Sequence, residues 1–244
     1  MSKLIRLFSL VLVFLVAFLG ACSKPGDDKK IDYRKLAGKS YNHGDSLINA
    51  GEPEAALIHL NKALELDSIF QRVHYQIGRA YYEMEEYEKA IPFFDQEVSL
   101  FPYHVEAVEL KAECQMYLGN LKAALKDINH ALRMGREKVG HAWYVKGMIL
   151  FEMKEYGKAI KLHSRAIRVN SSTPEFYVKR AIAFGELGKF QEMLTDAEMA
   201  LKLDSVYTDA FHIAAFANER QGNQEQAVYY NEKATALEGS ENAH

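Results

Sequence analysis

Side chains that could do chemistry are present in this chain, but none is spaced as an active site or a metal site requires. Nine histidines occur, and no two of them lie three or four residues apart, the spacing that places two imidazole ligands on one helix face. The chain also has no His-Glu-x-x-His helix, no Gly-x-Ser-x-Gly turn, no Gly-rich phosphate loop and no Cys-x-x-Cys pair. The sequence therefore predicts no catalytic, metal or cofactor site, and we do not expect an enzyme.

The composition narrows the class of protein further. A chain of 244 residues with 48% hydrophobic and 26% charged residues is close to the globular average, which excludes a disordered, collagen-like or multi-pass membrane protein. The 30 basic and 33 acidic residues leave no basic surplus of the kind that nucleic-acid binders carry. The two cysteines, Cys22 and Cys114, cannot build a disulfide framework or a thiolate zinc site. We expect Cys114 to be a reduced, partly buried thiol.

The first 21 residues have the pattern of a secretory signal. Lys3 and Arg6 precede a run of 13 residues from Leu7 to Leu19 that one serine interrupts. This run is too short for a comfortable membrane-spanning helix and fits the apolar core of a signal peptide. It ends in Leu-Gly-Ala followed by Cys22, which resembles the lipobox of bacterial lipoproteins. The resemblance implies removal of residues 1–21 and a lipid on Cys22, with an ordinary signal peptide or a short uncleaved anchor as the alternatives.

Residues 22–36 are predicted to be the lipidated cysteine and a flexible tether. The stretch Ser-Lys-Pro-Gly-Asp-Asp-Lys-Lys is polar and contains both proline and glycine. Two acyl chains give stable anchoring where one gives only marginal binding. Because Ser23 rather than aspartate follows the cysteine, the lipoprotein resemblance favours the outer membrane, on its periplasmic side.

The rest of the chain must supply the framework, and it repeats with a period of 34 residues, with one extra residue near position 139. A small residue recurs at Gly44, Gly78, Ala112, Gly147, Ala181 and Ala215. A second column follows twelve residues later at Ala56, Ala90, Ala124, Ala159, Met193 and Ala227. The spacing within each unit is helical, and turn signals such as Leu-Gly-Asn separate two helices per unit.

These residues resemble the tetratricopeptide repeat family, whose unit is a helix–turn–helix of this length. The resemblance implies an all-α, right-handed α-solenoid of six repeats at residues 37–70, 71–104, 105–138, 140–173, 174–207 and 208–241. Glu97 and Met193 stand where alanine is expected, so we expect looser packing in the second and fifth repeats.

In this family the first helices of the repeats line a concave groove that binds peptides or helices. Projecting one face of each first helix inward predicts partner-binding residues at Tyr41, Tyr75, Arg79, Tyr82, Glu113, Tyr117, Tyr144 and Phe151. Tyrosine is common among the residues that dominate binding energy. The alternative is that these aromatic side chains only cover the ridge between neighbouring helices. The groove carboxylates favour neutral or basic segments over acidic ones.

The expected function is that of a lipid-anchored scaffold of the bacterial envelope, holding a protein partner to assist assembly or localisation of a complex. The chain is similar to pilotin lipoproteins of type IV pili and to repeat lipoproteins that organise envelope hydrolases, and the sequence does not choose between them. The alternative from another class is a glycan- or ligand-binding accessory protein of cell-wall metabolism. Self-association also stays open.

Overall fold

The protein is described by a computed structural model that covers residues 32–70, 72–135 and 140–241. The chain divides into two compact units, residues 1–33 and 34–244, and all described residues except Asp32 and Tyr33 belong to the second. Twelve helices make up the described ranges: α2 (Tyr33–Asn49), α3 (Pro53–Leu66), α4 (Val73–Glu83), α5 (Tyr87–Leu100), α6 (Val105–Tyr117), α7 (Leu121–Met134), α8 (Gly140–Glu152), α9 (Tyr156–Val169), α10 (Pro174–Glu186), α11 (Phe190–Leu203), α12 (Thr208–Arg220) and α13 (Gln224–Glu241).

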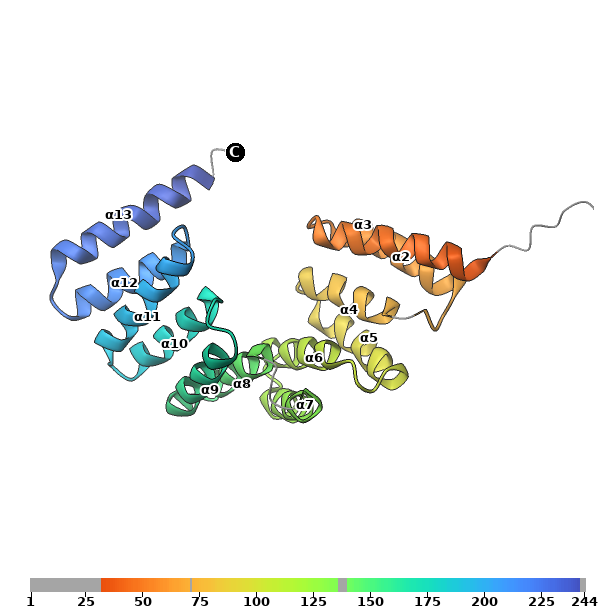
Figure 1. Cartoon of the computed structure of the whole chain (residues 1–244), viewed down its shortest axis with the longest axis horizontal. Coiled ribbons are helices and arrows are strands. Elements are labelled where there is room, and N and C mark those ends of the chain that lie inside the picture. The colour runs from red at the N-terminus through yellow and green to blue at the C-terminus, as the bar shows by residue number, and fades with distance from the viewer. Residues whose placement is uncertain (1–31, 71, 136–139, 242–244) are drawn as a thin grey trace, which may run out of the picture. The chain divides into compact units, whose positions relative to one another are not determined.

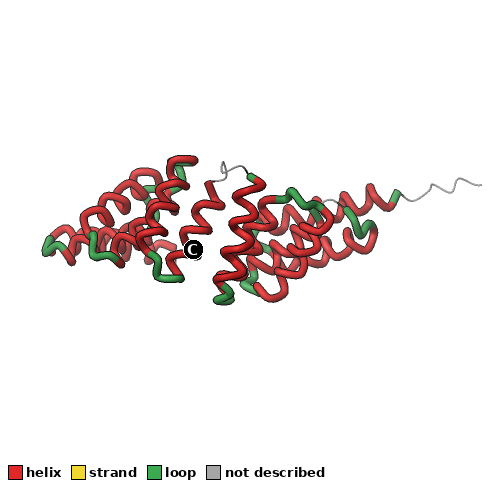
Figure 2. Tube along the Cα trace, turned by 90° about the horizontal axis from the view of Figure 1, so that it is seen from below, coloured by secondary structure: helices red, strands yellow, loops and turns green. Residues whose placement is uncertain are grey.

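Short turns join the helices throughout the described ranges, as Figures 1 and 2 show, and no strand is found there. The prediction of an all-α solenoid is confirmed. Helix α2 begins at Tyr33, so residues 33–36 of the predicted tether are helical. Cys22, the signal segment and the rest of the tether lie outside the described residues.

The turn inside each helix pair contains one residue with a left-handed backbone at the same place in the repeat. Four of the six are glycines, at positions 51, 119, 188 and 222 with φ between 69° and 82°. Glycine adopts this conformation without a steric cost. Glu85 and Lys154 occupy it in the other two turns, with φ of 58° and 61°. The turn geometry is therefore kept even where the residue type does not favour it.

The small-residue column lets the two helices of a pair approach closely. A Cβ atom added to Gly44 would lie 2.6 Å from Leu60 Cγ, and one added to Gly147 would lie 2.5 Å from Cε1 of His163. Real Cβ atoms do not come so near other heavy atoms. These two positions therefore require glycine, because a large side chain of the second helix fills the space that a Cβ would take.

The two departures from the alanine pattern do not loosen the packing. Glu97 is fully buried, and its carboxylate accepts hydrogen bonds from the Tyr75 backbone N–H at 3.2 Å and lies 2.7 Å from His104 Nδ1. Met193 is also buried, and Gly185 gives it room, since a Cβ at that glycine would lie 2.9 Å from the Met193 sulfur. The expectation of looser packing was wrong because both larger residues have specific partners.

The first helices of successive pairs contact one another as well as their neighbours in sequence. Such contacts join α4 to α6, α6 to α8, α8 to α10 and α10 to α12, whereas no second helix contacts another second helix among α3–α13. The first helices therefore form a continuous side of the repeat array. We call the side formed by α4, α6, α8, α10 and α12 the first-helix face.

Candidate functional site

The first-helix face contains a pocket where α6, α8 and α10 meet. Its volume is about 150 Å³. Side chains from three first helices and one second helix line it, and we call it the central pocket: Met116, Tyr117, Met148, Phe151, Glu152, His163, Lys179 and Ile182. The walls are mostly apolar, with one carboxylate and one ammonium among the lining groups.

Helical spacing brings these residues to one place. Met148 and Glu152 lie four residues apart on α8, and Lys179 and Ile182 lie three apart on α10, so each pair faces the same side of its helix. The described residues place no hydrogen-bond or ion-pair partner within reach of either Glu152 or Lys179. Within the described ranges, both charges at the central pocket are thus unpaired.

His163 of α9 reaches the central pocket beneath Gly147 of α8, which has no side chain to block it. The imidazole is 1% exposed, and its Nδ1 has no hydrogen-bond partner among the described residues. Burial, together with the nearby charges of Lys179 and Arg180, lowers the pKa of His163 to about 3. The ring is therefore neutral at physiological pH and supplies an unpaired polar atom to the lining.

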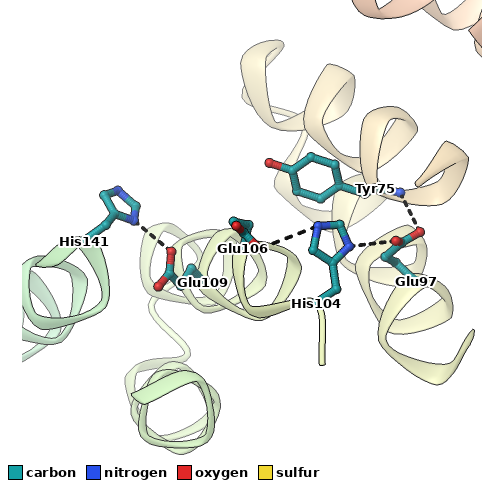
Figure 3. A network of polar contacts seen from close by, with 6 residues as sticks. All are labelled: Tyr75, Glu97, His104, Glu106, Glu109 and His141. Carbon is teal, nitrogen blue, oxygen red and sulfur yellow. Dashed lines mark hydrogen bonds and ion pairs between the residues drawn. The ribbon is translucent and has the colours of Figure 1, made fainter. Parts of the chain in front are cut away.

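Two buried carboxylates, Glu109 and Glu113, join α6 to its neighbours. The Tyr82 hydroxyl of α4 donates to Glu113 Oε2 at 2.7 Å. His141 of α8 lies with Nδ1 3.2 Å from Glu109 Oε2 and Nε2 3.6 Å from Glu113 Oε1, and Figure 3 shows its contact with Glu109. Oε1 of Glu109 has no hydrogen-bond partner among the described residues. The cluster bridges three consecutive first helices.

Burial and the neighbouring charges shift the pKa values of Glu113 and His141. Burial raises the pKa of Glu113 above its usual range, because the His141 charge and the Tyr82 hydrogen bond offset it only in part and the Glu109 and Glu175 charges add smaller increases. Burial disfavours the charged imidazole of His141, but the Glu109 hydrogen bond and the Glu113 charge outweigh it, so the pKa of His141 is raised. The pKa values of a carboxylate on α6 and an imidazole on α8 are therefore both raised, the first by burial and the second by carboxylate contacts that outweigh its burial.

A second polar network lies near the junction of α4, α5 and α6. Glu97 binds the Tyr75 backbone and His104, whose ring lies 4.6 Å from the Tyr75 ring. Nε2 of His104 lies 3.8 Å from Glu106, as Figure 3 shows. The Glu97 carboxylate thus joins residues within the second repeat, and the His104 contact with Glu106 is the one that reaches the third.

Four of the predicted partner-binding residues are held by contacts between helices. Tyr144 is 3% exposed and its hydroxyl donates to Glu175, while Glu113 is 4% exposed. Tyr82 is half-buried and is held by its bond to Glu113. Tyr75 is also half-buried and packs against Phe94 and His104. These side chains make contacts within the repeat array, and their part in partner binding stays a prediction.

Of the other four, one is exposed and three are half-buried. Tyr117 is 51% exposed and lines the central pocket, with its ring stacked 4.8 Å from that of Tyr87. Phe151 lines the same pocket. Arg79 binds Asn49 Oδ1 at 3.1 Å, and half-buried Tyr41 packs on Phe70, both away from the pocket.

Sequence reasoning missed the charged and polar members of the central pocket. Glu152 directly follows Phe151, which was predicted, whereas Lys179 lies on α10, from which no partner-binding residue was predicted. His163 is a buried member of the pocket lining. Its access to the pocket depends on the missing side chain at Gly147.

Two further findings concern the described residues only. None of the helices from α2 to α13 is long and apolar enough to cross a membrane. Within the same ranges, no group of three or more His, Cys, Asp or Glu residues is placed to hold a metal ion.

Comparison with known sequences gives relatives of the same repeat type. A TPR repeat-containing protein of Methanocaldococcus jannaschii is 28% identical over 170 residues, which cover 66% of this chain and 30% of that protein. The chain spans about a third of the length of the curated relatives it matches.

Two solved structures are similar in fold. PilW, described as a widely conserved type IV pilus biogenesis factor, superposes with a TM-score of 0.75 at 15% identity, covering 82% of this chain and 93% of that one. PilF of Pseudomonas aeruginosa gives a TM-score of 0.71 at 13% identity over 84% of this chain and 93% of that one. At such low identity these similarities show the fold alone.

The sequence model of the tetratricopeptide repeat matches residues 41–105 and 110–173, more than half of the chain. Proteins with this repeat generally mediate protein–protein interactions and are generally non-enzymatic. On this match and the twelve paired helices, the chain belongs to the tetratricopeptide repeat family.

Proposed function

We propose that this protein holds a segment of a partner protein on its first-helix face and that a lipid on Cys22 anchors it to the bacterial envelope, on the periplasmic side of the outer membrane. The observation that carries the binding part is the central pocket, which is open, mostly apolar and lined by three consecutive first helices. A peptide or helix that crosses α6, α8 and α10 would bury an apolar side chain there.

The fold of two pilus-assembly proteins supports a role in assembling an envelope complex, because PilW and PilF share this architecture over most of their length. The lipid anchor is supported by the sequence before residue 22. The pathway in which the partner acts is part of the proposal and rests on this fold similarity.

The binding part is tested by capture from detergent-solubilised envelopes with wild type and a Tyr117→Ala/Phe151→Ala variant. A Tyr103→Ala/Tyr229→Ala variant is the matched control, since both of these tyrosines are exposed and neither lines the central pocket. We expect a partner that wild type and the control retain and the pocket variant loses. Equal recovery by all three proteins would place the interface elsewhere.

The anchor is tested separately by labelling cells with radioactive palmitate. We expect the wild-type chain to carry label and to partition into detergent, and a Cys22→Ser variant to do neither. Label on both proteins, or on neither, would contradict lipidation at Cys22.

A further inference from the structure

The surroundings of the central pocket carry more exposed negative than positive charge. Glu152 lines the pocket, and Glu175 and Glu186 lie on the same stripe of α10 as Lys179 and Ile182, one helical turn beyond each end. All three glutamates are exposed, whereas Lys179, the single cation in the pocket lining, is half-buried. Arg180, the other cation near His163, is paired with Asp196, so three exposed carboxylates against the ammonium of Lys179 leave an excess of negative charge at the rim.

The buried carboxylates of α6 add to the negative charge near the central pocket. Besides burial, the charges of Glu113 and Glu175 raise the pKa of Tyr117, which lies at the pocket edge. Glu109 and Glu113 share a single imidazole, that of His141, as their cationic neighbour. An acidic segment approaching this part of the first-helix face would therefore meet repulsion from several directions.

The size and lining of the pocket indicate what else the occupant carries. A pocket of about 150 Å³ with mostly apolar walls is large enough for a benzene-sized group. Met116, Met148 and Ile182 offer adaptable apolar walls. The unpaired Nδ1 of His163, almost fully buried in the lining, is a polar group for which the described chain provides no partner.

We infer that the central pocket takes an aliphatic or aromatic side chain of the partner segment and that the glutamates at its rim select a lysine or arginine next to it in that segment. This inference rests on the proposed function and adds the chemistry of the partner. The partner class is thus a segment that pairs an apolar residue with a basic one, within one helical turn.

Glu152 and Lys179 allow a direct test because they carry opposite charges at the same pocket and neither has an ion-pair partner among the residues that the structure describes. Neutralising Glu152 weakens binding of a basic segment, and neutralising Lys179 strengthens it. An acidic segment would respond in the opposite sense to both changes. The two affinity changes together therefore show whether the bound segment is basic or acidic.

The probe is a phage-displayed library of random 12-residue peptides, selected on the full-length chain in detergent. We expect the enriched peptides to contain an apolar residue with Lys or Arg one to four positions away. Their dissociation constants are then measured by fluorescence anisotropy. For a solvent-exposed ion pair we expect Glu152→Gln to weaken binding about three- to fivefold and Lys179→Gln to strengthen it by a similar factor.

Matched controls on the second helices are Glu192→Gln on α11 and Lys161→Gln on α9, both exposed and away from the pocket, and neither should change affinity. Met148→Ala removes an apolar wall and should weaken binding about tenfold or more if the pocket holds the anchor. Circular dichroism of each variant shows whether the fold is kept, and Ile182→Val gives a milder change of the wall if Met148→Ala unfolds.

The outcomes separate the two proposals. Enriched peptides that lack basic residues, or equal responses to Glu152→Gln and Lys179→Gln, would overturn the charge selection, and the binding face would stand if Met148→Ala still weakened binding. Peptide binding that neither wall variant affects, or no enrichment at all, would overturn the proposed binding face together with this inference.

Discussion

Replacing Gly147 with alanine tests the close packing that brings His163 to the central pocket. The new Cβ would lie 2.5 Å, 2.8 Å and 2.9 Å from Cε1, Nδ1 and Nε2 of His163. The imidazole is rigid and 1% exposed, so it has no room to withdraw. Helices α8 and α9 would have to move apart.

The expected cost follows from two opposing effects. Overpacking in a filled core costs about 1–3 kcal/mol, and a clash with three ring atoms belongs at the upper end of that range. Alanine recovers about 1 kcal/mol relative to glycine in the interior of a helix. The Gly147→Ala variant should therefore be less stable than wild type by about 2 kcal/mol.

Urea unfolding measured by circular dichroism and by tryptophan fluorescence provides the assay. Trp143, the only tryptophan of the chain, is buried in α8, so its fluorescence reports on the same helix. Gly157→Ala on α9 is the matched control, because no atom lies within 4 Å of a Cβ at that exposed position. Because Gly157 lies in the first turn of α9, this control should be at least as stable as wild type, with a gain below the ~1 kcal/mol of a helix interior.

The clash also predicts non-additivity. Adding His163→Ala to Gly147→Ala should cost less than the sum of the two single changes, since the ring that clashes is gone. A Gly147→Ala variant as stable as wild type, or strict additivity in the double variant, would refute the packing described for α8 and α9.

Three more predictions follow from buried or strained groups. The pKa of His163 is near 3 in the folded protein and 6.5 in an ordinary histidine, so unfolding below pH 6.5 takes up a proton. The free energy of unfolding should therefore fall as the pH drops below 6.5, by about 3 kcal/mol at pH 4.5. Tyr82→Phe leaves a buried Glu113 oxygen without its donor and should cost about 1–3 kcal/mol in urea unfolding. Lys154→Gly relieves a left-handed backbone and should raise stability by about 1 kcal/mol.

Each of these has a control within the chain. A His163→Gln variant should lose less stability between pH 7 and pH 4.5 than wild type, and an equal loss would contradict the assignment to His163. Tyr81→Phe removes a hydroxyl that has no partner among the described residues and should change stability by less than about 0.5 kcal/mol. Lys154→Ala should bring none of the gain expected for glycine, because alanine has the same left-handed strain as lysine.

The repeat architecture could be predicted from the sequence because it depends on local spacing. The recurrence of Gly78 and Ala90 at fixed distance from their counterparts marks where two helices touch, and glycines such as Gly119 mark the turns between them. These are properties of single residues and short intervals. No long-range information was needed to obtain the fold class.

The candidate site was less predictable because it depends on which polar groups find each other between helices. The projection of one helix face treated Tyr117 and Tyr144 alike, yet Tyr144 is used in a bond to Glu175 and Tyr117 is exposed. The expectation of loose packing around Glu97 likewise considered only the size of its side chain. Its partner His104 lies in the next inter-helix turn, and the sequence does not state that the two side chains meet.

The measurement that tests the central claim most directly is site-specific photo-crosslinking in the cells that naturally make this protein. A photoreactive phenylalanine analogue is placed at Tyr117 in the central pocket or at Tyr229 on α13, which are 51% and 50% exposed and so equally available to a passing protein. A partner crosslinked from position 117 and absent from position 229 is the result we predict. Crosslinks from position 229 alone, or the same products from both positions, would contradict a binding site on the first-helix face.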